Sequence, residues 1–221
     1  MKNRKPRQRD ADATRAALLN AARQLFADRG FDGTRTQLIA DRAGVNKAMI
    51  SYYFKGKKGL YQTLLIEDLQ AAQNQLAAAD SPGTPPAERL SRFLMTLSAS
   101  LTHNPGMVRI LVREQMGGSR NLEPRVWKQL FNFFKSVREI LQDGMECGSF
   151  RKIDPHALHL SLVGGLIYYL LTEPARETYA KAGDLPPTPS WNDYVKIQRD
   201  LFLRALTPDK QIESTSRRKK K

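Results

Sequence analysis

Cysteine is nearly absent from this chain. Cys147 is the single cysteine among 221 residues, so no disulfide can form within the chain. Because many secreted proteins depend on disulfides, this shortage favours a reducing compartment, and we expect a cytoplasmic protein. Cys147 is either a packed side chain or a sensor of oxidants; packing is the usual role of a lone cysteine late in an amphipathic helix.

Long apolar runs are missing as well. The longest covers residues 157–171 and includes His159 and Ser161. A membrane-spanning helix needs about 20 apolar residues, so we expect no contact with a membrane. Hydrophobic residues still make up 41% of the chain, which is enough for one sizeable core or two small ones.

The chain lacks the usual signatures of catalysis and metal binding. It contains no nucleophile elbow, no glycine-rich phosphate loop and no cluster of metal ligands. His156 and His159 are three residues apart, as in half of a metal site, but no third ligand of suitable spacing accompanies them, and we interpret both as helix-surface histidines. We therefore predict no enzymatic activity, no metal and no other cofactor.

Acidic residues are too few to balance the basic ones. The chain has 36 Lys and Arg but 22 Asp and Glu, which gives a formal net charge of +14. The excess lies at the two ends, because residues 1–60 hold 14 basic and five acidic residues and residues 217–221 are all basic. A basic N-terminal part on a neutral body indicates a polyanionic partner at that end.

What the chain does contain is helical periodicity along most of its length. Apolar residues recur three and four positions apart, and we find no strand pattern and no internal repeat. The predicted helices cover residues 12–28, 36–43, 46–54, 57–79, 86–103, 107–116, 123–147, 154–172 and 190–206. The sequence therefore predicts an all-α fold of about nine helices.

The stretch from residue 33 to 61 predicts two short helices joined by a glycine turn. Ala40 is small enough to let a second helix pack closely, and Gly44 suits a left-handed residue where the first helix ends. Ile50 is then placed to point into the crevice between the two helices. This spacing is typical of a helix-turn-helix that reads DNA.

These patterns divide the chain into four parts. Residues 1–10 form a basic flexible arm, which either reaches along DNA or is disordered, and residues 11–56 form the helix-turn-helix domain. Residues 57–207 form a helical body for ligand binding and dimerisation. Residues 208–221 form a basic disordered tail.

Two of the predicted helices are apolar on more than one side. Residues 154–172 are apolar nearly all round and contain Gly164, and residues 190–206 carry apolar side chains on two faces. Such helices must bury both faces, either inside one large bundle or partly against a second copy of the chain. We favour a homodimer through these two helices, because a two-fold dimer presents two reading heads to a palindromic site.

One combination of residues is specific to a family. It consists of Leu18, Leu19, Ala21, Ala22, Leu25, Phe26, Gly30, Phe31, Ile39, Ala40, Ala43, Gly44, Val45, Tyr52, Tyr53, Phe54, Lys57, Leu60 and Tyr61. In this combination the chain resembles the TetR family of bacterial transcriptional regulators. The resemblance implies a DNA-binding head of three helices, a dimerising body, and a repressor that a small-molecule effector releases from a palindromic double-stranded DNA operator. A transcriptional activator and a DNA-binding protein without a ligand remain open as alternatives.

The resemblance also implies which residues contact DNA. By position these are Thr34, Thr36, Gln37, Asn46, Lys47, Ala48, Ser51, Tyr52, Tyr53 and Lys57. Lys57 would meet a phosphate at a helix N-terminus, and Thr34 or Thr36 could cap the helix of residues 36–43, as Asn46 would cap the next. The chain departs from the family at Arg35, where Ser or Thr is usual, and at Lys58 and Gly59, where acidic residues are frequent.

The body offers candidates for an effector pocket. They are His103, Met107, Arg113, Trp127, Phe131, Phe134 and Tyr168, with His156, His159 and Tyr169 nearby in sequence. The set combines apolar bodies with a few polar groups, as small-molecule sites do, although each aromatic also suits the core. The helix of residues 57–79 links head to body, so its tilt is the lever that we expect an effector to move.

Overall fold

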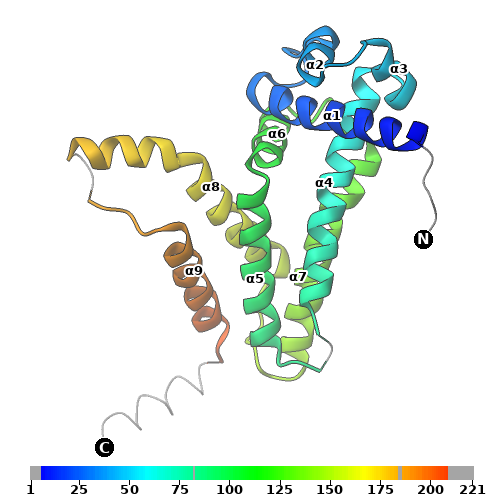
Figure 1. Ribbon diagram of the computed structural model, residues 1–221. Helices are drawn as coiled ribbons and strands as arrows, with labels where there is room; N and C mark the ends of the chain where they lie inside the picture. Colours follow the sequence, from blue (N-terminus) through cyan, green and yellow to red (C-terminus); the bar gives the residue numbers. More distant parts are fainter. Residues whose placement is uncertain (1–5, 82, 184–185, 209–221) are drawn as a thin grey trace, which may run out of the picture. The chain divides into compact units, whose positions relative to one another are not determined.

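The computed structural model describes residues 6–81, 83–183 and 186–208, with side chains from residue 10 onward (Figure 1). Its helices are α1 (Pro6–Arg29), α2 (Thr36–Ala43), α3 (Ala48–Phe54), α4 (Lys57–Ala79), α5 (Pro86–His103), α6 (Pro105–Met116), α7 (Pro124–Glu146), α8 (Pro155–Ala182) and α9 (Trp191–Leu206). Within the described ranges there is no strand. The predicted all-α class is therefore confirmed.

The first helix begins earlier than the sequence suggested. Residues 6–10, predicted to belong to a flexible arm, are helical in α1. The reason is that proline fits the first turn of a helix, where its missing N–H is not needed. The rest of the predicted arm, residues 1–5, and the predicted tail from residue 209 lie outside the described residues.

The eighth helix is also longer than predicted, because Pro174 does not end it. Arg176 holds the turn around this proline: its Nη1 donates to the carbonyl of Tyr169 at 2.6 Å and also to the hydroxyl of Thr172. The helix ends instead at Gly183, which adopts a left-handed conformation with φ of 82°. Predicted to end near residue 172, α8 therefore continues for about three more turns.

Cys147 lies outside α7, in the turn after Glu146, and its side chain is exposed. The hydroxyl of Ser149 lies 3.1 Å from its sulfur, and hydrogen bonding by Ser149 lowers the pKa of the thiol. The interpretation of Cys147 as a packed side chain is therefore wrong, because the helix stops one residue short of it.

The chain divides into two compact units. Unit 1 comprises Met1–Ala71 and Asn104–Leu130, and unit 2 comprises Ala72–His103 and Phe131–Lys221. Unit 1 thus holds α1, α2, α3 and α6 with the first parts of α4 and α7. Across the described ranges, no helix combines the length and apolar character needed to cross a membrane.

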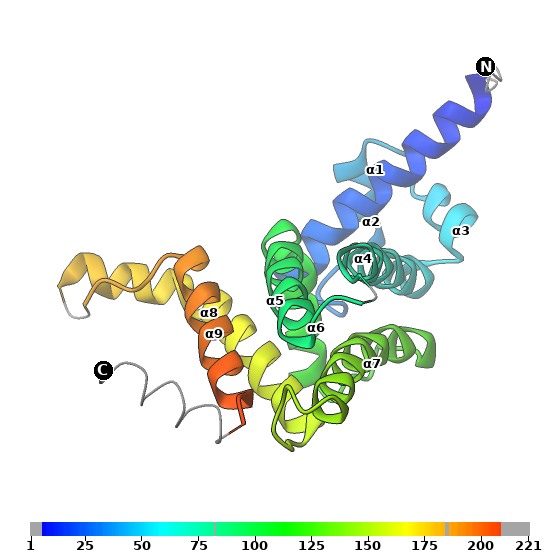
Figure 2. The same cartoon turned by 90° about the horizontal axis from the view of Figure 1, so that it is seen from below.

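Unit 1 is organised around α1, which packs against both α2 and α6 (Figures 1 and 2). Leu18, Ala22 and Phe26 on its inner side are fully buried. The Phe26 ring meets Tyr61 of α4 edge to face, with 4.8 Å between ring centroids, and Phe31 lies 5.0 Å from the same tyrosine. These aromatic contacts fix the start of α4 against the helix-turn-helix.

The buried carboxylate of Glu114 joins Tyr61 of α4 to α6. The hydroxyl of Tyr61 donates to Oε1 of Glu114 at 2.8 Å, and the side-chain amide of Asn121 donates to the same oxygen at 3.0 Å. The backbone N–H of Asn121 donates to Oε2 of Glu114 at 3.3 Å. Burial and the bond to Glu114 raise the pKa of Tyr61 far above its ordinary value, so the phenol stays a donor.

The carboxylate of Asp68 in α4 binds both α1 and the residue before α6. Arg23 donates two hydrogen bonds to Asp68, at 3.0 and 2.7 Å, and Asn104 donates from Nδ2 to the same carboxylate at 2.7 Å. Asn104 also caps α6, because its side-chain oxygen accepts from the N–H of Met107. Thus α1, α4 and α6 are joined by both apolar and polar contacts.

Unit 2 is built from the end of α4, from α5, from the later part of α7, and from α8 and α9. Its buried positions include Leu94 of α5, Leu141 of α7, Leu162 of α8 and Val195 of α9. The backbone of Arg151 donates to the carbonyl of Leu206 at 2.8 Å, which joins the connection after α7 to the end of α9.

An alanine at position 144 is expected to destabilise unit 2. The added Cβ would lie 2.0 Å from Cδ2 of Phe150, a ring that is only 5% exposed. Overpacking of this kind costs about 1–3 kcal/mol, which outweighs the about 1 kcal/mol that alanine gains over glycine in a helix. The urea midpoint of Gly144→Ala should therefore fall below that of the parent protein.

Gly106→Ala is the matched control, because its added Cβ would meet Ala27 and Arg23 at 3.5 Å, an ordinary contact distance. This variant should unfold at the parent midpoint or above it. An unchanged midpoint for Gly144→Ala would contradict the packing of Phe150 against α7.

Candidate nucleic-acid interface

The turn between α2 and α3 has the geometry that the sequence predicted. Gly44 caps α2 with φ of 67°, and the N–H of Val45 donates back to the carbonyl of Ala40 at 3.1 Å. Ala40 is fully buried and Ile50 is 1% exposed. The left-handed glycine therefore turns the chain sharply enough for α3 to pack across α2.

Asn46 organises the start of α3. Its Oδ1 accepts from the N–H of Ala48 at 2.8 Å, and its carbonyl accepts from Met49 at 2.9 Å. The side chain therefore holds the turn that leads into α3. The helix begins at Ala48, two residues later than expected, so the cap position belongs to Lys47 and not to Asn46 as predicted. Because Oδ1 is used in this way, the amide Nδ2 is the group that Asn46 can offer to DNA.

The outer face of α3 is accessible. Lys47, Ala48 and Ser51 are exposed, and the ring of Tyr52 is 75% exposed. Tyr53 is half-buried and meets Tyr52 edge to face, with 4.9 Å between centroids. An exposed cation, hydroxyl groups and aromatic rings along one short helix suit contacts with base edges and phosphates.

Thr34 does not share this exposure. Its side chain is fully buried, and its hydroxyl lies 2.7 Å from the carbonyl of Gly30 and 3.1 Å from that of Leu25. The hydroxyl thus closes the connection between α1 and α2 from inside. This placement corrects the prediction that Thr34 contacts DNA.

The start of α2 also differs from the expectation. Neither Thr34 nor Thr36 occupies the cap position, which belongs to Arg35, an exposed residue that makes no side-chain capping bond. The first N–H groups of α2 therefore lack a side-chain cap, and a helix N-terminus of this kind favours an anion such as a phosphate. Thr36 is half-buried in this first turn, and exposed Gln37 donates to Asp41 at 2.8 Å.

Lys57 is engaged inside unit 1. Its ammonium group donates to the carbonyls of Phe31 and Thr34, at 2.9 and 3.1 Å, and lies 4.3 Å from the centre of the Phe31 ring. These bonds fasten the first residue of α4 to the connection between α1 and α2. Two of its three N–H donors are thus used within unit 1, which makes Lys57 a residue that positions the head, while its contact with a phosphate stays a prediction.

Sequence reasoning missed the role of Gly59. An added Cβ there would lie 1.8 Å from the carbonyl oxygen of Phe54, so only glycine allows the end of α3 to approach α4 so closely. Lys55 adopts a left-handed conformation with φ of 60° in the same connection. The signal in the sequence was the departure from the family at position 59, but sequence alone gave no reason for it.

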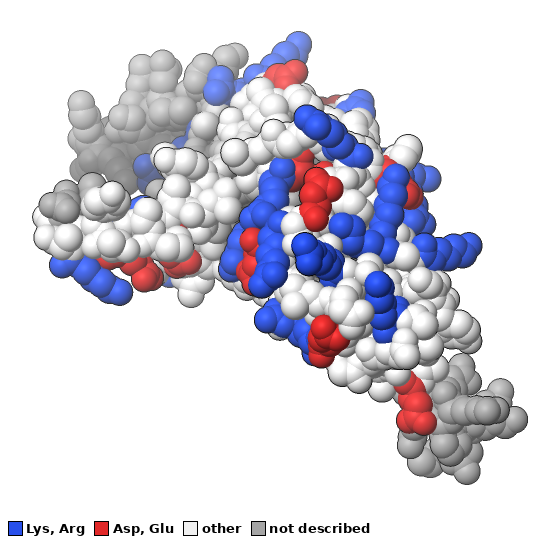
Figure 3. Space-filling model, turned by 90° about the horizontal axis from the view of Figure 1, so that it is seen from above, with Lys and Arg blue, Asp and Glu red and all other residues white. Residues whose placement is uncertain are grey.

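Positive charge surrounds this surface. Arg35, Lys47, Lys55 and Lys58 are exposed in unit 1. In Figure 3, Lys and Arg side chains outnumber Asp and Glu on the face of the molecule that is viewed from above. A surface of this kind attracts the phosphate backbone before any base is read.

The predicted effector residues divide between the two units. Met107, Arg113 and Trp127 belong to unit 1, and the other four, among them His103, belong to unit 2. Met107 is buried, and Arg113 donates to the carbonyl of Asp28 at 3.3 Å. Arg113 thus supports the end of α1 rather than standing free for a ligand.

Several of the aromatic candidates are exposed instead of facing inward. On α7, Trp127 is 46% exposed and Phe131 66%, because the buried stripe of this helix runs through other residues such as Val126 and Val137. On α8, Tyr168 is 71% exposed, while its neighbour Tyr169 is buried. The alternative that Trp127 and Phe131 belong to the core is therefore wrong.

Phe134 is half-buried and contacts both histidines of α8, with centroid distances of 5.1 Å to His156 and 5.5 Å to His159. His156 is exposed, as interpreted, but His159 is half-buried. Burial lowers the pKa of His159, and the neighbouring His156 lowers it further. Because its lowered pKa favours the neutral imidazole, His159 is uncharged at neutral pH and above, and its contact with the Phe134 ring is then undisturbed by charge.

A left-handed glycine turn that presents the exposed outer face of a short helix within a basic surface defines a DNA-binding protein of the helix-turn-helix class. Residues 18–64 match the family described as "Bacterial regulatory proteins, tetR family", and residues 86–182 match the "Tetracyclin repressor-like, C-terminal domain". The chain belongs to the TetR family of bacterial transcriptional regulators.

Relatives and solved structures of regulators resemble the chain over nearly its full length. The HTH-type transcriptional regulator RutR of Escherichia coli K12 is 27% identical over 202 residues, covering 91% of this chain and 94% of RutR. The HTH-type transcriptional repressor NicS of Pseudomonas putida KT2440 is 29% identical over 211 residues, covering 90% and 95%.

The fold is shared with solved structures of low sequence identity. A regulatory protein in the tetR family from Rhodococcus RHA1 superposes with a TM-score of 0.74 at 20% identity, covering 89% of this chain and 98% of that one. The fatty acid degradation regulator FadR from Bacillus halodurans gives 0.67 at 18% identity, covering 91% and 97%.

Replacement of Lys57 by alanine tests whether this residue positions the head or contacts a phosphate. Because its two bonds to carbonyls would be lost, we expect a loss of stability of about 1–2 kcal/mol. DNA binding should weaken, and if Lys57 acts by positioning alone, the dependence of log K on log salt should keep its slope. Urea unfolding and titration of a selected DNA site at several salt concentrations measure the two effects.

Lys58→Ala is the matched control, since the Lys58 side chain is 63% exposed and should contribute less than about 0.5 kcal/mol to stability. If Lys57→Ala instead kept full stability and lowered the salt slope by about one unit, Lys57 would be a phosphate contact after all.

Proposed function

We propose that the protein is a homodimeric, ligand-responsive repressor that reads a palindromic DNA operator with α3 and leaves it when a small molecule binds to the body. The observation that carries this proposal is the outer face of α3, presented by the Gly44 turn inside a basic surface. The relative NicS, itself named a repressor, supports the direction of regulation. The proposal places the protein in the cytoplasm and assigns it no enzymatic activity.

The exposed side chains of the head indicate which groups would contact DNA. Lys47 and Ser51 are placed to reach base edges, because they carry exposed donors at the start and middle of α3. Tyr52 and Tyr53 offer hydroxyl groups to phosphates, as does Thr36 beside the uncapped start of α2. Three further groups complete the interface: Gln37, the amide of Asn46 and the methyl of Ala48.

Dimerisation through α8 and α9 is supported by exposed apolar side chains on both helices. On α8, Leu160 is 58% exposed and Tyr168 71%, and on α9 Leu201 is 57% and Ile197 45% exposed. An added Cβ at Gly164, one turn from Leu160 and Tyr168, would meet no atom within 4 Å, so the backbone of α8 is open to close approach there. Apolar faces of this kind are normally covered by another chain.

Release from DNA requires coupling between body and head. Helix α4 belongs to unit 1 up to Ala71 and to unit 2 from Ala72. Its first turns carry Lys57 and Tyr61, which fasten it to the head, and Tyr61 also reaches Glu114 of α6. A ligand that favours one tilt of α4 would therefore change the spacing of two heads in a dimer.

Substitution of Lys47 and Tyr52 tests the reading of DNA by α3. Lys47→Ala should change the preferred sequence, because removal of a base contact costs about 1–3 kcal/mol at one position. Tyr52→Phe should weaken binding of all sequences by a similar factor, because a lost phosphate contact carries no sequence information. Selection from a random DNA pool, followed by competition titrations, measures both effects. Unchanged preference and affinity in both variants would refute the role of α3.

A charge on the proposed dimer face should separate the protomers. Leu201→Glu would place a carboxylate in an apolar interface, and we expect a shift from dimer to monomer in analytical ultracentrifugation. Binding of the full palindrome should fall at least about tenfold, because one head then binds without its partner. Lys196→Glu, at another exposed position on α9, is the control. A Leu201→Glu variant that remains fully dimeric would place the interface elsewhere.

A further inference from the structure

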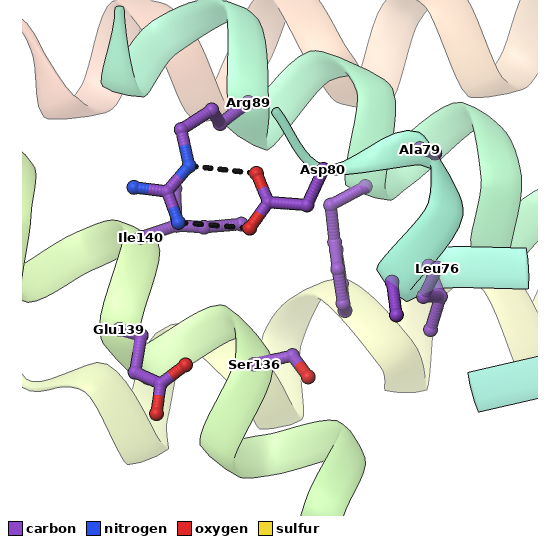
Figure 4. Close-up of a pocket in the computed structure, with 9 residues that line it drawn as sticks. Leu76, Ala79, Asp80, Arg89, Ser136, Glu139 and Ile140 are labelled. Carbon is purple, nitrogen blue, oxygen red and sulfur yellow. Dashed lines mark hydrogen bonds and ion pairs between the residues drawn. The ribbon is translucent and has the colours of Figure 1, made fainter. Parts of the chain in front are cut away.

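Unit 2 contains a pocket that takes no part in the DNA interface. It has a volume of about 320 Å³ and lies where the end of α4, the start of α5 and the later part of α7 meet (Figure 4). Leu76, Phe93 and Ile140 supply apolar walls from the three helices. The volume is at the small end of the range for small-molecule sites, about 300–1,000 Å³, and suits an occupant of about one ring.

The single arginine of the pocket is already neutralised. Arg89 donates from Nε and Nη2 to the two carboxylate oxygens of Asp80, at 2.7 and 2.9 Å, and from Nη1 to Asp143. Its side chain is only 14% exposed, and these bonds raise its pKa while the bond from Arg89 lowers that of Asp80. Both groups therefore stay charged, and Arg89 has little attraction left for an anion.

Glu139 also lines the pocket, and its carboxylate makes a weaker ion pair than that of Asp80. Glu139 of α7 is 56% exposed and meets Lys135 at 3.8 Å, one turn earlier, in an exposed pair of small strength. Ser136, on the same side of the pocket, donates its hydroxyl proton to the carbonyl of Asn132 at 3.1 Å, so its oxygen remains an acceptor. Figure 4 shows Ser136 and Glu139 opposite the Asp80–Arg89 pair.

The polar lining therefore offers acceptors. The lining holds two carboxylates, those of Asp80 and Glu139, and one guanidinium, that of Arg89, which Asp143 outside the lining also neutralises. The cations nearby are paired as well, Lys135 with Glu139 and Arg92 with Glu88. Such a balance favours a positively charged occupant and disfavours a carboxylate or phosphate.

We propose that this pocket binds a small organic cation, with its apolar body against Leu76, Phe93 and Ile140 and its ammonium group bonded to Glu139 and to the oxygen of Ser136. The inference rests on the proposed function in one respect, that the body of the regulator takes a small molecule, and it names the chemical class. The anchor is Glu139, because Asp80 and Asp143 are already bonded to Arg89.

Three probes of the same size and different charge test this inference. Calorimetric titration of the full chain, without DNA, compares benzylammonium, benzyl alcohol and benzoate. Benzylammonium should bind at least about fivefold more tightly than benzyl alcohol, because a hydrogen bond to a charged group is stronger than one between neutral groups. Benzoate should bind most weakly. A preference for benzoate, or no binding of any probe, would overturn the proposal.

A pair of variants locates the anchor. Glu139→Gln should bring benzylammonium and benzyl alcohol to within about twofold of each other, because the carboxylate charge is removed while the shape is kept. Glu146→Gln changes an exposed glutamate of the same helix outside the pocket and should keep the fivefold preference. Equal loss of preference in both variants would show a general effect of charge and overturn the site.

The design separates this inference from the proposed function. Failure of the proposed function would appear as loss of sequence-specific DNA binding by the parent protein, with benzylammonium binding intact. Failure of the inference would appear as absent or charge-independent probe binding, with sequence-specific DNA binding intact.

Discussion

The contact on which unit 1 depends is the position of Tyr61 between the aromatic rings of the head and the buried carboxylate of Glu114. Its ring packs on Phe26 and Phe31, and its hydroxyl donates to Glu114. Together with the bonds of Asp68 to Arg23 and Asn104, this contact fixes the direction of α4 relative to α1 and α6. The bonds of Lys57 to two carbonyls reinforce the same joint. The close approach of Gly59 to the carbonyl of Phe54 sets the end of α3 against α4, so α3 can present its outer face as a defined surface.

Most of the fold could be predicted from the sequence because helical periodicity and strong stop signals agree. The predicted bounds of α2, α4 and α5 match the structure, since glycine and proline mark their ends. The two largest differences from the predicted bounds lie at prolines. Pro6 begins α1 and Pro174 lies within α8, where Arg176 bonds to the carbonyl of Tyr169 across the turn. Such tertiary and side-chain support cannot be seen in a local pattern.

The site was less predictable than the fold, because a motif indicates which residues matter but not where each side chain points. Gly44, Asn46 and the exposed side chains of α3 follow from local geometry. Thr34 and Lys57 were assigned to DNA by position, yet both bond to backbone carbonyls inside the head, partners that lie up to 26 residues away in sequence. The pocket beside Arg89 was missed for the same reason, since it is formed by three helices and by an ion pair between Asp80 and Arg89 that no spacing rule indicates.

The central claim is that α3 and the start of α2 are the surface that touches DNA. Amide hydrogen exchange, measured with and without a selected palindromic DNA site, tests it most directly. The account predicts slower exchange on DNA binding at residues 36–37 and 47–53, with α5 unchanged. If DNA were bound while exchange in α2 and α3 stayed the same, and slowed only elsewhere in the chain, the account would be contradicted.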